Sequence, residues 1–237
     1  MFQIRPSEGR GRNKLSWLDT RFTFSFDQYY DPEYVHFRSL RVLNEDIVAP
    51  SQGFGMHLHR DMEILTWILE GALEHRDSMG SDAVIRPGEL QHMSAGTGVM
   101  HSEFNPSPKV ATHLLQIWLL PERKGLKPEY EQLAFPDAEL RGRFHLVAGP
   151  EAPVMIHQDA TLYIARLDKG TEAQCALAAG RYAWLQVARG TVRLNGHSKD
   201  HAKGIDLKAG DGVAISSEPE VQVEAKDTCE VLLFDLA

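Results

Sequence analysis

The sequence predicts an all-β fold built from two related halves. Short segments alternate apolar and polar side chains, as strands with one buried face do. Gly and Pro turns separate these segments, and no long amphipathic helix intervenes. Two stretches repeat after about 120 residues: Ile68–Leu73 resembles Val187–Val192, and Val84–Glu89 resembles Ile205–Asp211. Many short strands with such a duplication indicate two β-sandwiches or barrels in tandem.

Composition narrows the class of protein further. The chain has 237 residues, enough for one large or two small domains, and its net charge is −8. An acidic balance argues against a nucleic-acid-binding surface, which needs basic residues to neutralise phosphates. No apolar run approaches the ~20 residues that span a bilayer, and the N-terminus lacks the apolar core of a signal peptide. We therefore expect a cytoplasmic protein in which Cys175 and Cys229 are reduced.

The N-terminal part of the chain can be divided by pattern. Residues 1–15 are polar and rich in Arg and Gly, and we interpret them as an arm with a solvated basic tip at Arg10, Arg12 and Lys14. Residues 21–26 alternate Phe with Thr and Ser, which predicts a strand before a turn at residues 29–32. Residues 63–70 form a more apolar run that predicts a buried strand.

The remaining segments follow the same scheme. Residues 99–104 and 110–120 predict strands. The glycine loop at residues 94–98, which precedes them, is interpreted as turn chemistry because no helix follows it. Residues 121–143 are charged and contain three prolines, which predicts a linker with one short helical turn. Strand patterns then resume and continue to the C-terminus.

Two short signatures carry the candidate chemistry. They are His57-Leu58-His59 and His101-Ser102-Glu103. Residues i and i+2 of a strand point to the same face, so each signature places two metal-capable side chains on one side of a strand. If the two strands are neighbours, three imidazoles and a carboxylate converge, which suits a first-row transition metal. The alternative interpretation is two solvated strand faces that bind no metal.

These residues resemble the pirin family, whose members are bicupin proteins. The resemblance extends through nearly the whole chain and is carried by RFTFSFDQYYDP (21–32), HLHRDMEILTWILEG (57–71), GELQHMSAGTGVMHSE (88–103) and LLQIW (114–118). The sequence is especially similar to bacterial pirins with quercetin 2,3-dioxygenase activity. The resemblance implies two cupin β-barrels packed face to face, with a metal-binding domain at residues 1–133 and a domain without metal ligands at residues 134–237.

The resemblance also implies a set of ligands. The pirin pattern falls on His57, His59, His101 and Glu103, with Glu103 also the candidate catalytic base. The implied cofactor is one divalent transition metal ion, with Fe(II) the leading candidate and Zn, Mn, Co, Ni or Cu as alternatives. More typical cupins take their carboxylate ligand from the position of Glu63, which is an even number of residues from His57 and His59. His92 lies near the position of another ligand in typical cupins. We favour Glu103 and keep Glu63 and His92 as alternatives.

The function implied is a dioxygenase that opens the flavonol ring of quercetin-like substrates and releases carbon monoxide. The phenolic substrate and dioxygen would enter past an apolar lip that includes Phe54, Met56 and Leu58. The main alternative is an iron-dependent binding protein that regulates a transcription factor or a metabolic enzyme. A third reading is a metal-stabilised cupin with an unrelated small-molecule substrate. We expect a monomer that contacts neither membranes nor nucleic acid directly.

The other histidines have no partner at a metal-binding spacing. His75, between two charged residues, is interpreted as a solvated strand end, and His113 as a packed, hydrogen-bonded residue of the barrel wall. The remaining ones are interpreted as structural or exposed: His36, His145, His157, His197 and His201.

Overall fold

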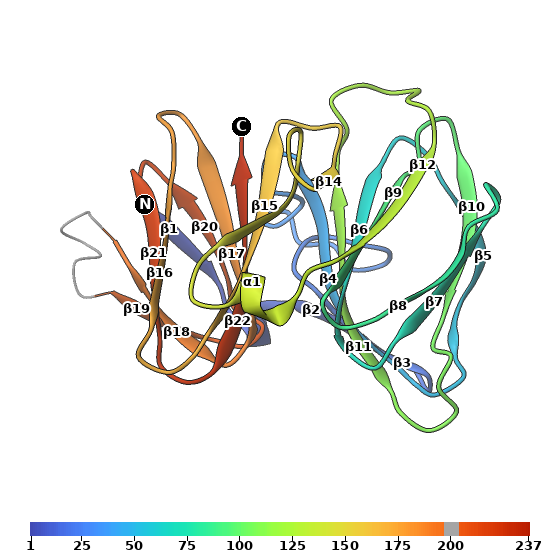
Figure 1. The fold of residues 1–237 in the computed structure, drawn as a ribbon, viewed down its shortest axis with the longest axis horizontal. Coiled ribbons are helices and arrows are strands. Elements are labelled where there is room, and N and C mark those ends of the chain that lie inside the picture. Colours follow the sequence, from blue (N-terminus) through green and yellow to red (C-terminus); the bar gives the residue numbers. More distant parts are fainter. Residues whose placement is uncertain (197–203) are drawn as a thin grey trace. The chain divides into compact units, whose positions relative to one another are not determined.

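A computed structural model describes residues 1–196 and 204–237 and confirms the predicted all-β class (Figure 1). His197 and His201 lie outside the described residues. The chain forms two compact units. The first unit contains Gly11–Phe135 and Val154–Gln158, and the second contains Met1–Arg10, Pro136–Pro153 and Asp159–Ala237. The predicted domain limits at residues 1–133 and 134–237 stay a prediction.

The first unit consists of two antiparallel sheets. The larger is seven-stranded, in the order β12-β9-β6-β11-β4-β3-β2, and the smaller is four-stranded, in the order β5-β10-β7-β8. The strands of the larger sheet are β2 (Gly11–Lys14), β3 (Leu18–Phe22), β4 (Leu40–Val48), β6 (Glu63–Glu70), β9 (Glu89–Ser94), β11 (Thr112–Leu119) and β12 (Glu129–Ala134). Those of the smaller sheet are β5 (Gly53–His59), β7 (Leu73–Asp77), β8 (Asp82–Ile85) and β10 (Val99–Phe104). Strand β14 (Val154–Met155) also belongs to this unit.

Apolar side chains from both sheets form the core of the first unit. Ile68 of β6 and Leu114 of β11 pack with Leu73 of β7 and Ile85 of β8, and all four are at most 1% exposed. Strand β6 is buried on both faces along most of its length, as its continuous apolar sequence predicts. Burial of apolar area on this scale is the main stabilising contribution to such a unit.

The second unit repeats this arrangement. Its larger sheet runs from β1 through β20, β17, β22 and β15 to β13, and its smaller sheet has the order β16-β21-β18-β19. Its strands are β1 (Phe2–Arg5), β13 (His145–Gly149), β15 (Ala160–Leu167), β16 (Glu172–Ala176), β17 (Tyr182–Arg189), β18 (Thr191–Asn195), β19 (Ile205–Lys208), β20 (Gly212–Ser216), β21 (Glu220–Ala225) and β22 (Cys229–Leu236). A 3-10 turn η1 (Ser7–Gly9) and the helical turn α1 (Asp137–Leu140) complete it. Buried Ala, Val, Leu and Ile side chains fill its core.

The N-terminal segment differs from the sequence prediction. Residues 1–15 are not an arm, because β1 pairs with β20 and β2 pairs with β3. Arg10 is buried, with 7% of its surface exposed, and Arg12 binds Asp19. The prediction failed because both strands are only four residues long and are held by pairing with other strands. In β1, Phe2 and Ile4 do alternate with polar residues, but over too short a stretch to stand out, and β2 has no apolar residue.

Two further segments depart from prediction. The strand predicted over residues 21–26 ends at Phe22, because Phe24 and Phe26 lie in the turn region that follows β3. The predicted helical turn within residues 121–143 is present as α1, but the segment is not all linker. Its residues Glu129–Ala134 form β12, which pairs with β9 at the edge of the larger sheet.

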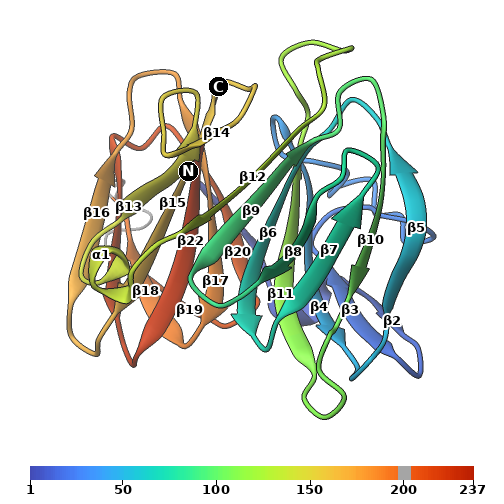
Figure 2. The same cartoon turned by 45° about the vertical axis from the view of Figure 1, so that its right-hand side comes forward.

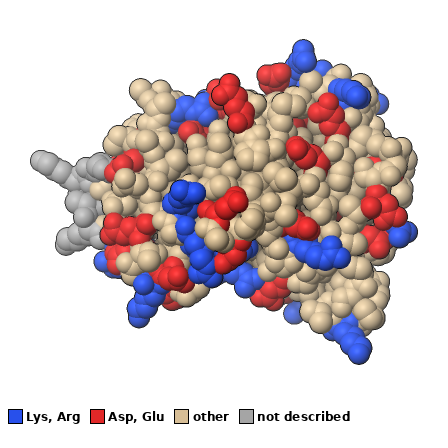
Figure 3. Space-filling view, in the orientation of Figure 1, with Lys and Arg blue, Asp and Glu red and all other residues tan. Residues whose placement is uncertain are grey.

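The surface charge is mixed. On the face drawn in Figure 3, Lys and Arg side chains are scattered among Asp and Glu. No helix within residues 1–196 and 204–237 is long and apolar enough to cross a membrane.

Candidate metal centre

The strands that carry the two signatures are neighbours in the smaller sheet of the first unit (Figure 2). Strands β5 and β10 are antiparallel, and His101 lies directly opposite His57. The predicted convergence of the two signatures required that their strands be neighbours, and this pairing shows that they are. It follows that side chains of both signatures can reach the same space on one face of the sheet.

A bulge interrupts this pairing one step further along. His101 faces His57, but Glu103 faces Phe54, so β5 has one residue more than β10 between these two pairs. Such a bulge reverses the alternation of β5 and turns Phe54 to the same side as His57. Gly53 then passes so close to the backbone of Glu103 that a Cβ would lie 2.1 Å from its carbonyl oxygen. The bulge therefore shapes the site, and Gly53 permits it.

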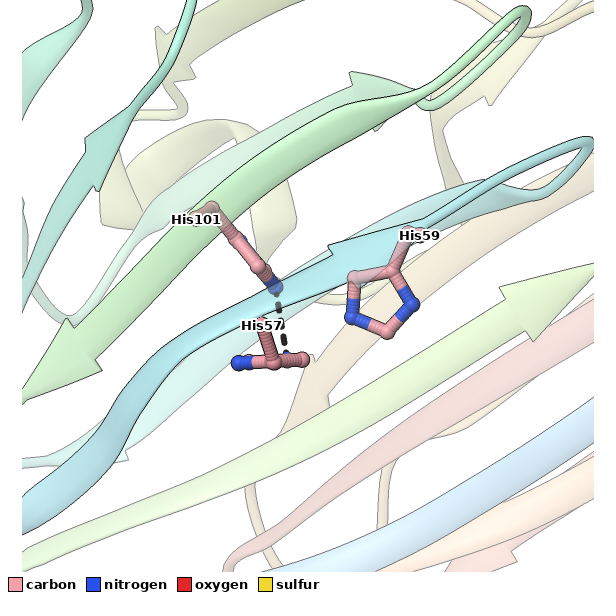
Figure 4. A group of neighbouring side chains, drawn as sticks. All are labelled: His57, His59 and His101. Carbon is pink, nitrogen blue, oxygen red and sulfur yellow. Dashed lines mark hydrogen bonds between the residues drawn. The ribbon is translucent and has the colours of Figure 1, made fainter.

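Three histidines form a compact triangle (Figure 4). The ring centroids of His57 and His59 are 4.7 Å apart, those of His57 and His101 are 4.5 Å apart, and those of His59 and His101 are 4.7 Å apart. One ring nitrogen from each lies within 4.8 Å of the others. Trp118 of β11 packs edge-on against His59 at 4.8 Å and limits its rotation.

The three rings are suited to bind a cation. The Nδ1–H of His57 donates to the carbonyl of Gly55 at 2.8 Å, which leaves Nε2 with its lone pair. Burial lowers the pKa of His59 to about 4, with a contribution from the charge of His57. Burial and the neighbouring histidines also lower the pKa of His101. The Nε2 atoms of His57 and His101 face each other at 3.1 Å, an arrangement of lone pairs that a cation between them would stabilise.

Glu103 does not belong to this triangle of histidines and shares only His101 with it. The structure brings His75, His101 and Glu103 together as a second set of metal-capable groups, so His101 belongs to both sets. Gln116 donates to both carboxylate oxygens of Glu103, at 3.2 and 2.9 Å, and is itself bound by Thr66. Burial, together with the charge of Asp46, raises the pKa of Glu103 to about 7.

His75 does not lie where the sequence predicts. It is fully buried, not a solvated strand end, and its Nε2 binds the carboxylate of Asp77 at 3.1 Å. Its ring packs against that of Tyr130 with 4.9 Å between centroids. The charged neighbours Glu74 and Arg76 point to the other face of β7, which explains the wrong interpretation. The spacing His75-x-Asp77 on a strand was the signal that could have indicated the inward pair.

The two alternative ligands are occupied elsewhere. The carboxylate of Glu63 binds His92 Nε2 at 2.9 Å, Ser94 Oγ at 2.6 Å and the backbone N–H of His157 at 3.1 Å. Burial alone would raise the pKa of Glu63, but these contacts outweigh it and lower the pKa. Among the described residues, neither Glu63 nor His92 belongs to a metal-capable group. Their arrangement indicates a structural role in which Glu63 fixes the segment Val154–Gln158 to the first unit.

We therefore expect Glu63→Ala to destabilise the fold without removing metal. The substitution leaves buried donors on His92, Ser94 and His157 unpaired, which costs about 3–5 kcal/mol when a buried pair is broken. Urea denaturation measures that cost, and elemental analysis of the folded protein should give the parent metal content. Loss of metal from folded Glu63→Gln, which keeps the side-chain shape, would show instead that Glu63 is a ligand.

A cavity opens beside the triangle within the first unit. Its volume is about 690 Å³, and His57, His59 and Glu103 lie on its wall. Aromatic side chains cover much of the rest, namely Trp17, Phe22, Phe26, Phe54 and Trp118. Of the predicted apolar lip, Phe54 lines the cavity, but Met56 and Leu58 do not and are 56% and 60% exposed. The bulge explains this division, because Phe54 shares the side of His57.

The fold and this centre define a class of protein. Paired β-sheets in two repeated units, with a histidine-rich centre inside the first, are the features of a two-domain cupin protein. Residues 3–119 match the Pirin family, and residues 146–236 match the quercetinase C-terminal cupin domain. The chain belongs to the pirin family.

Its relatives include proteins of known structure. It is 45% identical to a quercetin 2,3-dioxygenase of Escherichia coli K12 over 100% of this chain and 99% of that protein. The crystal structure of YhhW from Escherichia coli superposes with a TM-score of 0.93 at 43% identity, covering 100% and 98% of the two chains. A nickel(II) complex of the bacterial pirin YhhW gives a TM-score of 0.91 at 44% identity, covering 100% and 99%.

Proposed function

We propose that this protein is a metal-dependent quercetin 2,3-dioxygenase. It opens the flavonol ring of quercetin-like substrates with dioxygen and releases carbon monoxide. One observation carries the proposal most directly: a cavity of about 690 Å³, lined by aromatic rings, has His57, His59 and Glu103 on its wall. That volume is in the range that encloses a small organic ligand. The full-length similarity to a quercetin 2,3-dioxygenase supports the same reaction.

The cavity offers distinct surfaces to the two ends of a flavonol. Trp17, Phe54 and Trp118 present aromatic surface on which planar rings can pack. Asn44 and Asp46 of β4 present polar atoms to the same space. The Oδ1 atom of Asn44 is buried without a hydrogen-bond partner, so a phenolic hydroxyl would satisfy it. Hydroxylated aromatic rings are therefore the substrate class that fits.

We propose His57, His59, His101 and Glu103 as the residues that hold one divalent metal ion. Three imidazole nitrogens and a carboxylate match the preferences of Fe(II), which we propose as the native metal. A metal of this kind supplies a Lewis-acidic, redox-active centre next to the substrate cavity. The nickel(II) complex of YhhW, to which this chain is 44% identical, supports a divalent metal at such a centre.

Glu103 would also act on a proton. A carboxylate ligand keeps an oxygen lone pair that can accept a hydroxyl proton from a substrate in the cavity. Its oxygens face the cavity, and the amide of Gln116 holds them in place. Glu103 would therefore deprotonate the flavonol, while the aromatic walls orient the ring and exclude water.

A paired incubation tests the proposed reaction. Protein purified without oxygen and loaded with Fe(II) is mixed with quercetin in sealed vials, with and without dioxygen. We expect quercetin absorbance to fall and carbon monoxide to accumulate in the aerobic vial alone. Aerobic loss of quercetin without carbon monoxide, or equal loss in both vials, would contradict the assignment.

A second candidate function rests on the outer face of the same strands. Met56, Leu58, Met100 and Phe104 of β5 and β10 are 39–60% exposed, and Leu58 lies opposite Met100. Exposed apolar surface behind the candidate ligands favours a protein partner such as a transcription factor or a metabolic enzyme. Leu58→Glu is expected to spare quercetin turnover and to weaken such an interaction, whereas Glu103→Ala is expected to abolish turnover.

We propose a cytoplasmic location on the basis of the two cysteines. Cys175 and Cys229 are free thiols, which favours a reducing compartment and hence the cytoplasm. A monomeric state remains a prediction from the sequence, and light scattering of the purified protein measures it.

A further inference from the structure

Three buried side chains form a line that ends at the triangle of histidines. The Nε2 atom of His101 faces His57 at 3.1 Å, and its Nδ1 atom faces Nδ1 of His75 at 3.4 Å. On the far side of His75, Nε2 lies 3.1 Å from Oδ2 of Asp77. The side chains of His75 and Asp77 have no solvent exposure, and His101 is 1% exposed. Each contact must therefore be satisfied by protons on the three residues themselves.

The carboxylate of Asp77 determines where those protons lie. Its Oδ1 atom accepts the backbone N–H groups of Met79 at 2.8 Å and Ser81 at 3.0 Å, which leaves Oδ2 for His75. Although burial alone would raise the pKa of Asp77, its hydrogen bonds lower it, and an ionised carboxylate can only accept. His75 must therefore carry its proton on Nε2, and its Nδ1 atom has a free lone pair.

The direction of the second hydrogen bond follows from the first. Because Nδ1 of His75 can only accept, the proton in its contact with His101 belongs to Nδ1 of His101. A neutral imidazole has one N–H, so Nε2 of His101 is left with a lone pair aimed at His57. This is the tautomer that a metal ligand at Nε2 requires.

We propose that Asp77 and His75 are positioning residues that hold His101 in its metal-binding tautomer and orientation. The proposal rests on the metal site of the proposed function and assigns no contact with substrate to either residue. Packing of Tyr130 on His75 keeps the relay in line, with the two rings tilted by 31°. In many metal sites a carboxylate or carbonyl takes the distal N–H of a histidine ligand directly. Here a second histidine transmits the effect of the carboxylate.

Nitrogen NMR of the metal-free protein tests the tautomers directly. In protein labelled with ¹⁵N at histidine, two-bond correlations between ring protons and ring nitrogens distinguish a protonated nitrogen from a bare one. We expect the proton of His75 on Nε2 and that of His101 on Nδ1. A proton on Nε2 of His101 would overturn the proposal.

The variant Asp77→Asn should reverse the relay. Two backbone N–H groups keep the amide oxygen at the position of Oδ1, so the amide NH₂ takes the place of Oδ2 and donates to Nε2 of His75. The proton of His75 then moves to Nδ1 and donates to His101, whose own proton moves to Nε2. The side-chain volume hardly changes, so a purely structural role for Asp77 would leave the tautomers unaltered. Unaltered tautomers in folded Asp77→Asn would therefore refute the relay.

Metal affinity provides a second readout. Competition with a chromophoric chelator for Zn²⁺ should show affinity lower by about 10–100-fold in Asp77→Asn, the usual effect of losing such an outer partner. Glu45→Gln is the matched control, because Glu45 binds His113 at 2.9 Å in the same unit outside the centre. The Glu45→Gln control should bind Zn²⁺ with the affinity of the parent protein. If Asp77→Asn also bound Zn²⁺ with the parent affinity, the proposal would be overturned. Expected tautomers and affinities without quercetin turnover would refute the proposed function but support this positioning role.

Discussion

Replacing His101 by alanine is expected to abolish metal binding and quercetin turnover together. His101 is the one residue shared by the two metal-capable sets among the described residues, so its loss separates Glu103 from His57 and His59. Two imidazoles without a third nitrogen hold a divalent ion weakly. A metal contributes several kcal/mol of charge stabilisation, so turnover should fall by at least about 10³-fold. Elemental analysis and a carbon monoxide assay on the same preparation measure both effects.

A matched variant separates this effect from general damage. His113→Ala removes a histidine of the same unit that is bound to Glu45 at 2.9 Å and lies outside the centre. It should keep parent metal content and turnover. If His101→Ala were folded, as judged by circular dichroism, and still held one metal per chain, the proposed ligand set would be wrong.

The second large effect is a gain of stability at the expense of activity in Asp46→Asn. Asp46 is 4% exposed, and burial raises its pKa from 3.8 to about 6. The carboxyl group of Asp46 thus binds its proton more tightly in the folded protein than in the unfolded chain. Stability is therefore full below about pH 4, falls as pH rises through 6, and stays low above it. An amide cannot ionise, so Asp46→Asn removes this loss.

The expected gain has a defined pH dependence. A shift of about two pKa units corresponds to about 3 kcal/mol, so metal-free Asp46→Asn should exceed the parent by up to that amount at pH 8 and by nothing at pH 4. Urea denaturation at several pH values measures the difference. Turnover of quercetin should fall, because Asp46 lines the cavity and influences Glu103. A parent–variant difference that does not vary with pH would contradict this account.

The location of Asp46 suggests why a costly carboxylate is retained. Protein stability and site chemistry often conflict at buried charged groups, and the gain expected from the amide is an instance of that conflict. The negative charge of Asp46 helps to raise the pKa of Glu103. Removing it should therefore make Glu103 a weaker base, as well as deprive a phenolic hydroxyl of an acceptor.

The sequence was sufficient for the fold class and for the pairs of candidate ligands. Continuous apolar sequence predicted β6, and i, i+2 spacing placed His57 with His59 and His101 with Glu103. These features are local, so a single strand carries all the information they need. That His57, His59, His101 and Glu103 together bind a metal ion stays a prediction.

Most of the failures have a non-local cause. Strand β1 is held in place by pairing with β20, which is distant in the sequence. His75 is buried against Tyr130 and His101, and the residues next to it in the sequence do not indicate these contacts.

The bulge in β5 is a mismatch between two strands, so the sequence of β5 alone could not show that Phe54 lies on the side of His57. Met56 and Leu58 were a local error, because their alternation with His57 and His59 already places them on the other face. Gln116 was missed because a single polar residue in an apolar strand has no distinguishing spacing. Asp46 was missed because it belongs to the polar run Asn44-Glu45-Asp46, which looks like a solvated stretch.

The exchange of short segments between the two halves of the chain affects the order in which the protein can form during synthesis. Phe2 pairs with Ile215, so β1 must wait for a partner that is synthesised much later in the chain. The first unit likewise lacks the backbone N–H that His157 donates to Glu63 until translation has passed that residue. Folding of this protein therefore cannot proceed to completion one half at a time, and the edge of β20 is closed only by β1, a strand that is made long before β20 itself.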